Sequence, residues 1–224
     1  MKSIDQIVSE RQLLGHPFYR RWQAGKVSRE VLHEYARQYY AYETKLPSFL
    51  EAALSHLEEG PAKDAIGQNL ADESGRPEPH PELWLRFAEA LGVSRREVLD
   101  AEPIPGTRNL VETYASLCGE GADEALAAIY AYEAQFSAVA ATKADGLRRF
   151  YGLTDPGGLK FFDLHASLDD DHAAAIRSGL PESERAHAAA ERALAAWWGM
   201  LDSFEALSEA GSEAGSEAGS EAGS

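Results

Sequence analysis

The chain has 224 residues, 44% of them hydrophobic, and a formal net charge of −16. That length and apolar content suit one globular domain, while the charge argues against a protein that binds nucleic acid or anionic membranes by general electrostatic attraction. No apolar run reaches the roughly 18 residues of a membrane span, no signal-peptide core opens the chain, and one cysteine, Cys118, permits no internal disulfide, so we expect a cytoplasmic protein.

The chain up to about residue 207 is expected to be helical, because Ala, Leu, Glu and Arg dominate and apolar residues recur at the spacing of a helix face. The N-terminal part predicts an amphipathic helix over 3–14, a short helix over 17–25 and a long helical segment over 28–57. Pro47 should kink or interrupt the long segment, because proline has no backbone N–H to donate.

The middle of the chain predicts a helix over 61–73, a proline-rich turn over 76–79 and a further helix over 80–91. Two more helices should follow over 107–117 and 122–150. The second is rich in alanine and apolar on most sides, which is typical of a helix buried near the centre of a domain.

The C-terminal part predicts a helix over 158–179 and a last helix over 181–207. From 208 to 224 the chain repeats Ser-Glu-Ala-Gly, which suits a natural low-complexity terminus as well as an added segment. Without aromatic or large aliphatic side chains it cannot bury enough surface to offset its ordering entropy. We therefore expect one all-α domain of about seven helices over 1–207 and a disordered tail over 208–224.

Three side chains that bind metals stand at i, i+4 and i+7 in the stretch His165-Ala-Ser-Leu-Asp169-Asp-Asp-His172. On a helix that advances about 100° per residue they would lie within roughly 60° of one another. Imidazole and carboxylate groups on one face can hold iron, manganese or zinc. A pair of surface histidines beside a solvated acidic run is the other interpretation.

Two further parts of the chain offer ligands. Glu133 lies in the apolar central helix, where a carboxylate is costly unless it is paired, protonated or bound to metal, although a narrow polar stripe with Gln135 and Lys143 would also explain it. Glu73 and His80 stand on either side of the proline-rich turn, which would equally suit a surface turn. The complete set has three carboxylates and three imidazoles, which suit two iron or manganese ions with open positions for dioxygen. Its members are Glu73, His80, Glu133, His165, Asp169 and His172.

This set, in an all-helical chain, resembles the haem-oxygenase-like dimetal oxidases, whose pattern is Glu-x6-His, a Glu on a central helix and His-x3-Asp-x2-His. The resemblance covers about residues 3–206. Within that superfamily the chain is most similar to the family named for the chlamydial protein associating with death domains. The resemblance implies a haem-oxygenase-like bundle, two Fe ions or a mixed Fe/Mn pair, dioxygen with an external reductant, and a homodimer.

The resemblance also implies an activity, the synthesis of p-aminobenzoate for folate by a self-sacrificing route. A tyrosine side chain of the protein is cut out to supply the ring, and a lysine is the source of the amine. Tyr19 stands at the position of the consumed tyrosine and Lys143 at that of the lysine, while Tyr35 and Tyr132 match two tyrosines that would relay electrons or shape the pocket. From the residues alone, Tyr19 would more often be a packing residue, and a solvated lysine near the end of the helix would explain Lys143 equally well.

Other functions remain open at this point. The same site could oxidise a diffusible amine, fatty acid or quinone precursor, or a structural metal site could support a non-catalytic interaction protein. Two Glu-x-x-His pairs, Glu30 with His33 and Glu184 with His187, would suit a ferritin-like dimetal bundle, but they lie in first turns that should be solvated.

Two relatives of the same fold act without a metal pair. Thiaminase II relies on a cysteine in the central helix, which has none here, and we expect Cys118 to be a small buried residue. Pyrroloquinoline-quinone synthase oxidises its substrate without a metal. The complete set of six ligands argues against that chemistry.

Overall fold

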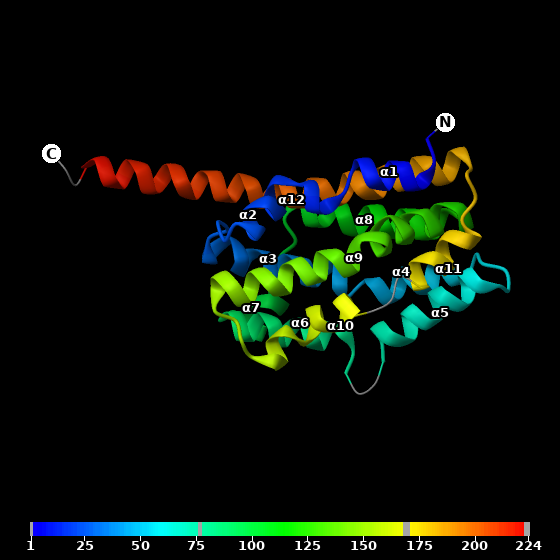
Figure 1. The fold of residues 1–224 in the computed structure, drawn as a ribbon, viewed down its shortest axis with the longest axis horizontal. Helices are drawn as coiled ribbons and strands as arrows, with labels where there is room; N and C mark the ends of the chain where they lie inside the picture. Colours follow the sequence, from blue (N-terminus) through cyan, green and yellow to red (C-terminus); the bar gives the residue numbers. More distant parts are fainter. Residues whose placement is uncertain (1, 76–77, 168–170, 222–224) are drawn as a thin grey trace.

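The computed structural model describes residues 2–75, 78–167 and 171–221, and all the regular structure in these residues is helical (Figure 1). The all-α prediction is confirmed, but the prediction of about seven helices is wrong. Proline and glycine divide the N-terminal segments into several short helices. In chain order the elements are α1 (Ile4–Glu10), the 3₁₀ helix η1 (Leu13–Gly15), α2 (Pro17–Gln23), α3 (Arg29–Glu43), α4 (Leu46–Leu54), α5 (Pro61–Glu73), α6 (His80–Leu91), α7 (Arg95–Leu99), α8 (Pro105–Glu120), α9 (Ala122–Tyr151), α10 (Pro156–Ser167), α11 (Asp171–Gly179) and α12 (Glu184–Glu221).

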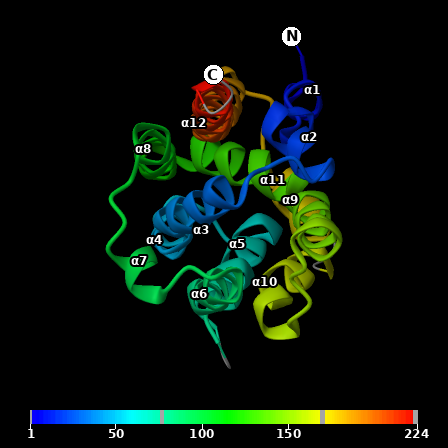
Figure 2. The same cartoon turned by 90° about the vertical axis from the view of Figure 1, so that its left-hand side faces the viewer.

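The long helices run along a common direction and form an elongated bundle (Figure 1). Seen along that direction, α12 and α8 lie on one side and α6 and α10 on the opposite side (Figure 2). Helix α9 packs against α8, α10, α11 and α12. Its alanines Ala125, Ala127, Ala128 and Ala131 are fully buried, so neighbouring helices approach it closely. The expected buried central helix is confirmed.

Pro47 separates two helices, as the sequence predicts: α3 ends at Glu43 and Pro47 lies in the first turn of α4. Helix α3 turns Tyr35, Tyr39 and Tyr42 towards the core at helical spacing. The ring of Tyr39 stacks on Trp84 of α6 with centroids 4.2 Å apart. An aromatic layer therefore lies inside the bundle beside α9.

The stretch predicted as one helix over 158–179 is assigned to two helices, α10 and α11. Helix α10 packs on α6 and α9, whereas α11 packs on α5 and α9. His165 lies on α10 and His172 on α11. Residues 168–170 between them, which include Asp169, lie outside the described part of the chain, so the placement of the three ligands on one helix face stays a prediction.

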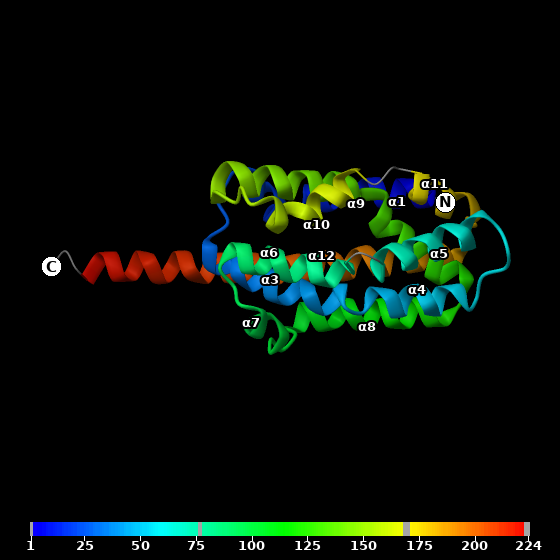
Figure 3. The same cartoon turned by 90° about the horizontal axis from the view of Figure 1, so that it is seen from below.

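Helix α12 continues into the Ser-Glu-Ala-Gly repeat as far as Glu221, and this end extends away from the bundle (Figure 3). Phe204 is fully buried and Leu207 is 43% exposed, so core packing ends near the predicted domain boundary at 207. A serine- and glycine-rich helix without packing partners is marginal in water. The disorder expected for the repeat stays a prediction. None of the described helices is both long and apolar enough to cross a membrane.

Candidate metal centre

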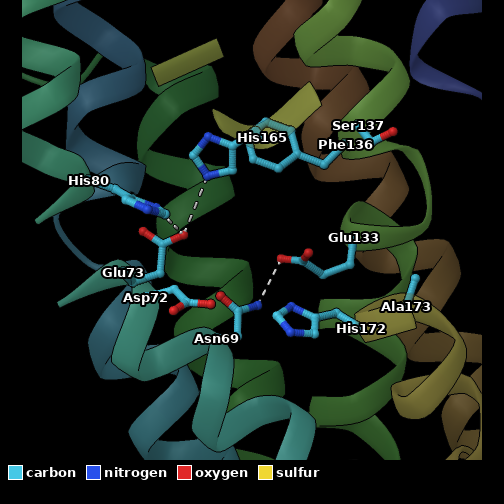
Figure 4. Close-up of a pocket in the computed structure, with 10 residues that line it drawn as sticks. All are labelled: Asn69, Asp72, Glu73, His80, Glu133, Phe136, Ser137, His165, His172 and Ala173. Carbon is cyan, nitrogen blue, oxygen red and sulfur yellow. Dashed lines mark hydrogen bonds and ion pairs between the residues drawn. The ribbon is translucent and has the colours of Figure 1, made fainter. Parts of the chain in front are cut away.

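Three buried side chains from three helices converge on one spot (Figure 4). Glu73 is the last residue of α5, His80 the first of α6, and His165 lies on α10. Oε1 of Glu73 is 2.9 Å from Nδ1 of His80 and 3.8 Å from Nε2 of His165. The three offer ligand atoms within 4.8 Å of one another, a spacing at which one divalent ion can bind all three.

Local sequence explains how Glu73 and His80 meet. Helix α5 ends at Glu73, and Pro79 and Pro81 fix the start of α6 around His80. The intervening turn therefore brings a carboxylate and an imidazole together, as the sequence predicts, and both side chains are buried rather than solvated.

The backbone sets the orientation of the His165 ring. Its Nδ1 lies 2.7 Å from the carbonyl oxygen of Phe161, one turn earlier, so Nδ1–H donates there and the Nε2 lone pair faces Glu73. Burial lowers the pKa of His165, although the nearby Glu73 carboxylate opposes this change. The lowered pKa favours the neutral imidazole, which is the form that binds a metal. This arrangement of a histidine fixed by a backbone carbonyl is typical of metal ligands.

Unpaired buried atoms support a metal in this cluster. Glu73 Oε2 has no hydrogen-bond partner among the described residues, and His80 Nδ1 and His165 Nε2 have none apart from their ion-pair contacts with Oε1 of Glu73. Such atoms are costly inside a protein, and a divalent ion would satisfy them together. The carboxylate and imidazole donors fit iron or manganese.

Glu133 of α9 and His172 of α11 face the same cavity from the opposite side (Figure 4). The amide of Asn69 donates a 3.1 Å hydrogen bond to Oε1 of Glu133. Burial raises the pKa of Glu133 to about 7 against this hydrogen bond, and the nearby Glu73 carboxylate adds to the rise. A bound cation would keep Glu133 ionised.

The predicted ligands therefore form two facing groups, one with Glu73, His80 and His165 and one with Glu133 and His172. Asp169 lies outside the described residues. The cavity between the groups has a volume of about 30 Å³, enough for ions, a water molecule or dioxygen. It is lined by Asn69, Asp72, Glu73, His80, Glu133, Phe136, Ser137, His165, His172 and Ala173.

Lys143 of α9 is fully buried, which excludes the alternative of a solvated lysine. Its Nζ lies 5.7, 5.1 and 4.8 Å from the ring centres of Tyr19, Tyr35 and Tyr39. Burial lowers the pKa of Lys143 to about 7, although the Glu43 carboxylate opposes the change. A substantial fraction of the amine is therefore neutral near neutral pH. The alternative of a narrow polar stripe formed by Glu133, Gln135 and Lys143 is therefore excluded. Lys143 is buried, and the side chain of Gln135 accepts a hydrogen bond from the backbone N–H of Leu13 instead.

Four buried tyrosines connect this lysine to the metal ligands. The hydroxyl groups of Tyr39 and Tyr132 are 2.5 Å apart, and Tyr132 directly precedes Glu133. Burial raises the pKa of Tyr19, Tyr35, Tyr39 and Tyr132, so all are neutral phenols. Sequence reasoning missed Tyr39, although its position four residues after Tyr35 on one helix face signals it.

Other candidate sites are not assembled. Glu30 and Glu184 are exposed, and His187 pairs with Glu182 at 2.6 Å, so within the described ranges the ferritin-like motifs do not converge. Cys118 is buried, as expected, and burial raises its pKa to about 12, which leaves it a poor nucleophile. The site therefore centres on carboxylates and imidazoles.

The chain is similar to several known proteins. Residues 33–205 match the family model described as an iron-containing redox enzyme. The chain is 37% identical to a 4-aminobenzoate synthase of Nitrosomonas europaea, over 90% of this chain and 89% of that protein. It is 31% identical to a 4-aminobenzoate synthase of Chlamydia muridarum, over 91% of this chain and 89% of that protein.

A solved structure of a TenA homologue from Pseudomonas syringae has the same fold. Its TM-score is 0.76 at 14% identity, and the match covers 90% of each chain. This confirms the haem-oxygenase-like fold that the resemblance implies. Since the family model spans most of the domain, the chain belongs to the family of iron-containing redox enzymes.

Proposed function

We propose that this protein is a self-sacrificing 4-aminobenzoate synthase, 4-aminobenzoate being p-aminobenzoate, which takes its ring from Tyr19 and its amine from Lys143. The observation that carries the proposal is the burial of the Lys143 amine against the ring of Tyr19. The two synthases that share 31–37% of its residues support the product.

The atoms of the product define the bonds involved. The ring and Cβ of Tyr19 supply all the carbons, so the bond between Cα and Cβ breaks and Cβ is oxidised to the carboxyl carbon. Nζ of Lys143 replaces the phenol oxygen, which leaves as water, and the bond from Nζ to Cε breaks, which leaves Cε as an aldehyde. Cα of residue 19 takes up a hydrogen, so a glycine remains there. Two molecules of dioxygen are the oxidant, and an external reductant supplies two electrons and two protons, which balances the reaction with two molecules of water as the other product.

The residues of the two facing groups would hold the metal pair. Glu73, His80 and His165 would form one side and Glu133 and His172 the other, and the sequence predicts Asp169 as a sixth ligand. When bound, the ions would activate dioxygen. Two Fe ions and a mixed Fe/Mn pair both fit these oxygen and nitrogen donors.

The tyrosines would carry an electron and a proton between the metal ligands and Tyr19. Tyr132 and Tyr39 share a short hydrogen bond, and the ring centres of Tyr39 and Tyr35 are 5.8 Å apart. A phenol that loses an electron must also release a proton, and a neighbouring hydroxyl accepts it. Tyr35 and Tyr39 also enclose the Lys143 amine.

The size of the cavity argues against a diffusible substrate. A volume of about 30 Å³ accommodates dioxygen but not a fatty acid, an amine with a carbon chain or a quinone precursor. The aromatic side chains around Lys143 are buried and leave it no exposure to solvent. A side chain of the protein itself therefore suits the site better as substrate.

A single reaction round tests the proposal. Protein loaded with iron, or with iron and manganese, is given reductant and dioxygen, and 4-aminobenzoate and intact protein mass are measured. We expect no more than one product per chain and a protein that has lost both the hydroxybenzyl group of Tyr19 and the amine nitrogen of Lys143. Tyr19→Phe should give none, whereas Tyr40→Phe, at a partly exposed tyrosine of α3, should react like the wild type. Many turnovers at unchanged protein mass would favour a diffusible substrate.

A further inference from the structure

Glu43 is a buried carboxylate that the predicted ligand set does not include. It is the last residue of α3 and is 1% exposed, and its Oε1 has no hydrogen-bond partner in the described part of the chain. The C-terminal end of a helix carries partial negative charge, which disfavours a carboxylate there. An ionised Glu43 is therefore costly unless a proton or a cation neutralises it.

The surroundings of Glu43 contain more carboxylates. Its carboxyl group interacts with the carboxyl group of Glu73 and lies near Glu133 and Lys143. Helices α3, α5 and α9 thus bring three glutamates to one place.

Two ionised carboxylates in contact inside a protein repel strongly unless a proton or a metal ion lies between them. Oε1 of Glu73 faces His80 and His165, while its Oε2 and Oε1 of Glu43 both lack partners among the residues described. The Lys143 amine does not pair with Glu43 by a hydrogen bond, because Nζ is also unpartnered in the same residues. Among the described residues, no cationic side chain therefore bridges the carboxyl groups of Glu43 and Glu73.

We propose that Glu43 is a further carboxylate ligand of the metal centre and binds an ion together with Glu73. This rests on the dimetal centre of the proposed function. With the predicted Asp169, the carboxylates Glu43, Glu73 and Glu133 carry a total charge that two divalent ions balance. Glutamate oxygens suit iron and manganese equally well.

Metal binding to the metal-free, full-length protein tests the proposal without any measurement of activity. Mn²⁺ and Fe²⁺ are titrated without dioxygen, and the number of bound ions and their Kd are measured. Glu43→Gln, which keeps the shape and removes the charge, should weaken the binding of at least one ion by about tenfold or more. It should also change the electron paramagnetic resonance spectrum of bound Mn²⁺, because an amide replaces a carboxylate.

Glu124→Gln is the matched control. Glu124 is also buried and has an unpartnered Oε2 among the described residues, but it pairs with Arg185 at 3.5 Å rather than with the metal ligands. Its variant should bind metal like the wild type. Should Glu43→Gln fail to fold, Glu43→Asp is compared with Glu124→Asp, and only the former should bind metal more weakly.

Unchanged affinity and an unchanged Mn²⁺ spectrum in Glu43→Gln would overturn the proposal, because a proton shared with Glu73 would then explain the contact. A wild type that binds no ion would overturn it as well. A wild type that binds metal but forms no 4-aminobenzoate would overturn the proposed function alone, since the titration involves neither dioxygen nor reductant.

Discussion

Nζ of Lys143 lies 5.7 Å from the ring centre of Tyr19, and both side chains are buried. The two residues come from α9 and α2, and their helices pack directly against each other. No chain segment has to move for the amine and the ring to be neighbours. The fold therefore holds the ring and the amine of the proposed product next to each other.

Replacement of Lys143 by Met should stabilise the metal-free protein and abolish 4-aminobenzoate formation. Folding lowers the pKa of Lys143 from 10.5 to about 7. At pH 7 the amine is therefore fully protonated in the unfolded chain but only partly protonated in the folded protein, and this difference reduces the free energy of unfolding. Methionine has no such group to titrate. The free energy of unfolding should rise by on the order of 2 to 4 kcal/mol. Urea denaturation measures it, and an equal or lower stability of the variant would contradict the buried amine.

The pH dependence of stability follows from the same lysine. Between about pH 7 and 10.5 the unfolded chain binds more protons than the folded one at this site, so its contribution to stability increases with pH in that window. The difference in unfolding free energy between Lys143→Met and the wild type should therefore shrink as pH rises from 7 to 10. Denaturation curves at several pH values provide the measurement, and a constant difference would contradict the lowered pKa.

Several features of the fold follow from local sequence. The capping box at Ser3, the break at Pro47 and the prolines around His80 each determine a helix boundary through the backbone of nearby residues. The meeting of Glu73 and His80 is predictable for the same reason, because a short turn joins them.

The surroundings of single side chains were less predictable. A lysine in an alanine-rich helix can lie in solvent or in the core. Lys143 is buried because Tyr19 of α2 and Tyr35 of α3 pack against its amine. Glu43 occupies an ordinary polar position near a helix end, and its burial depends on α5 and α9, which are distant in sequence. Long-range packing, which residue spacing does not encode, determines both.

Tyr39→Phe should slow the loss of the Tyr19 side chain while the protein still binds metal. The substitution removes the hydroxyl that lies 2.5 Å from Tyr132 and so interrupts the proton route. We expect a rate lower by about tenfold to 100-fold in a single round, measured from intact mass against time. Tyr151→Phe is the control, because that hydroxyl bonds to the backbone of Val27 and should affect stability rather than rate. Equal rates for wild type and Tyr39→Phe would exclude Tyr39 from the relay.

Metal should stabilise the fold through Glu73. An ion present at 100 times its Kd adds about 2.7 kcal/mol to the free energy of unfolding, provided it binds only the folded state. The Tm of the wild type should therefore rise on addition of Mn²⁺ and fall again with a chelator. Glu73→Gln should lose most of this rise, because it removes the carboxylate that faces His80 and His165. A full metal-dependent rise in Glu73→Gln would show that the ion binds elsewhere.

The ion on the Glu133 side should bind more weakly as pH falls below about 7. Burial raises the pKa of Glu133 to about 7, so protons compete with the metal below that pH. Asn69→Leu removes the hydrogen bond that opposes this rise, and the variant should therefore need a higher pH for the same affinity. Mn²⁺ titrations between pH 6 and 8 measure the displacement. Gln68→Leu, on the exposed face of the same helix, should leave the profile unchanged, and an identical profile in Asn69→Leu would mean that Asn69 does not tune the ligand.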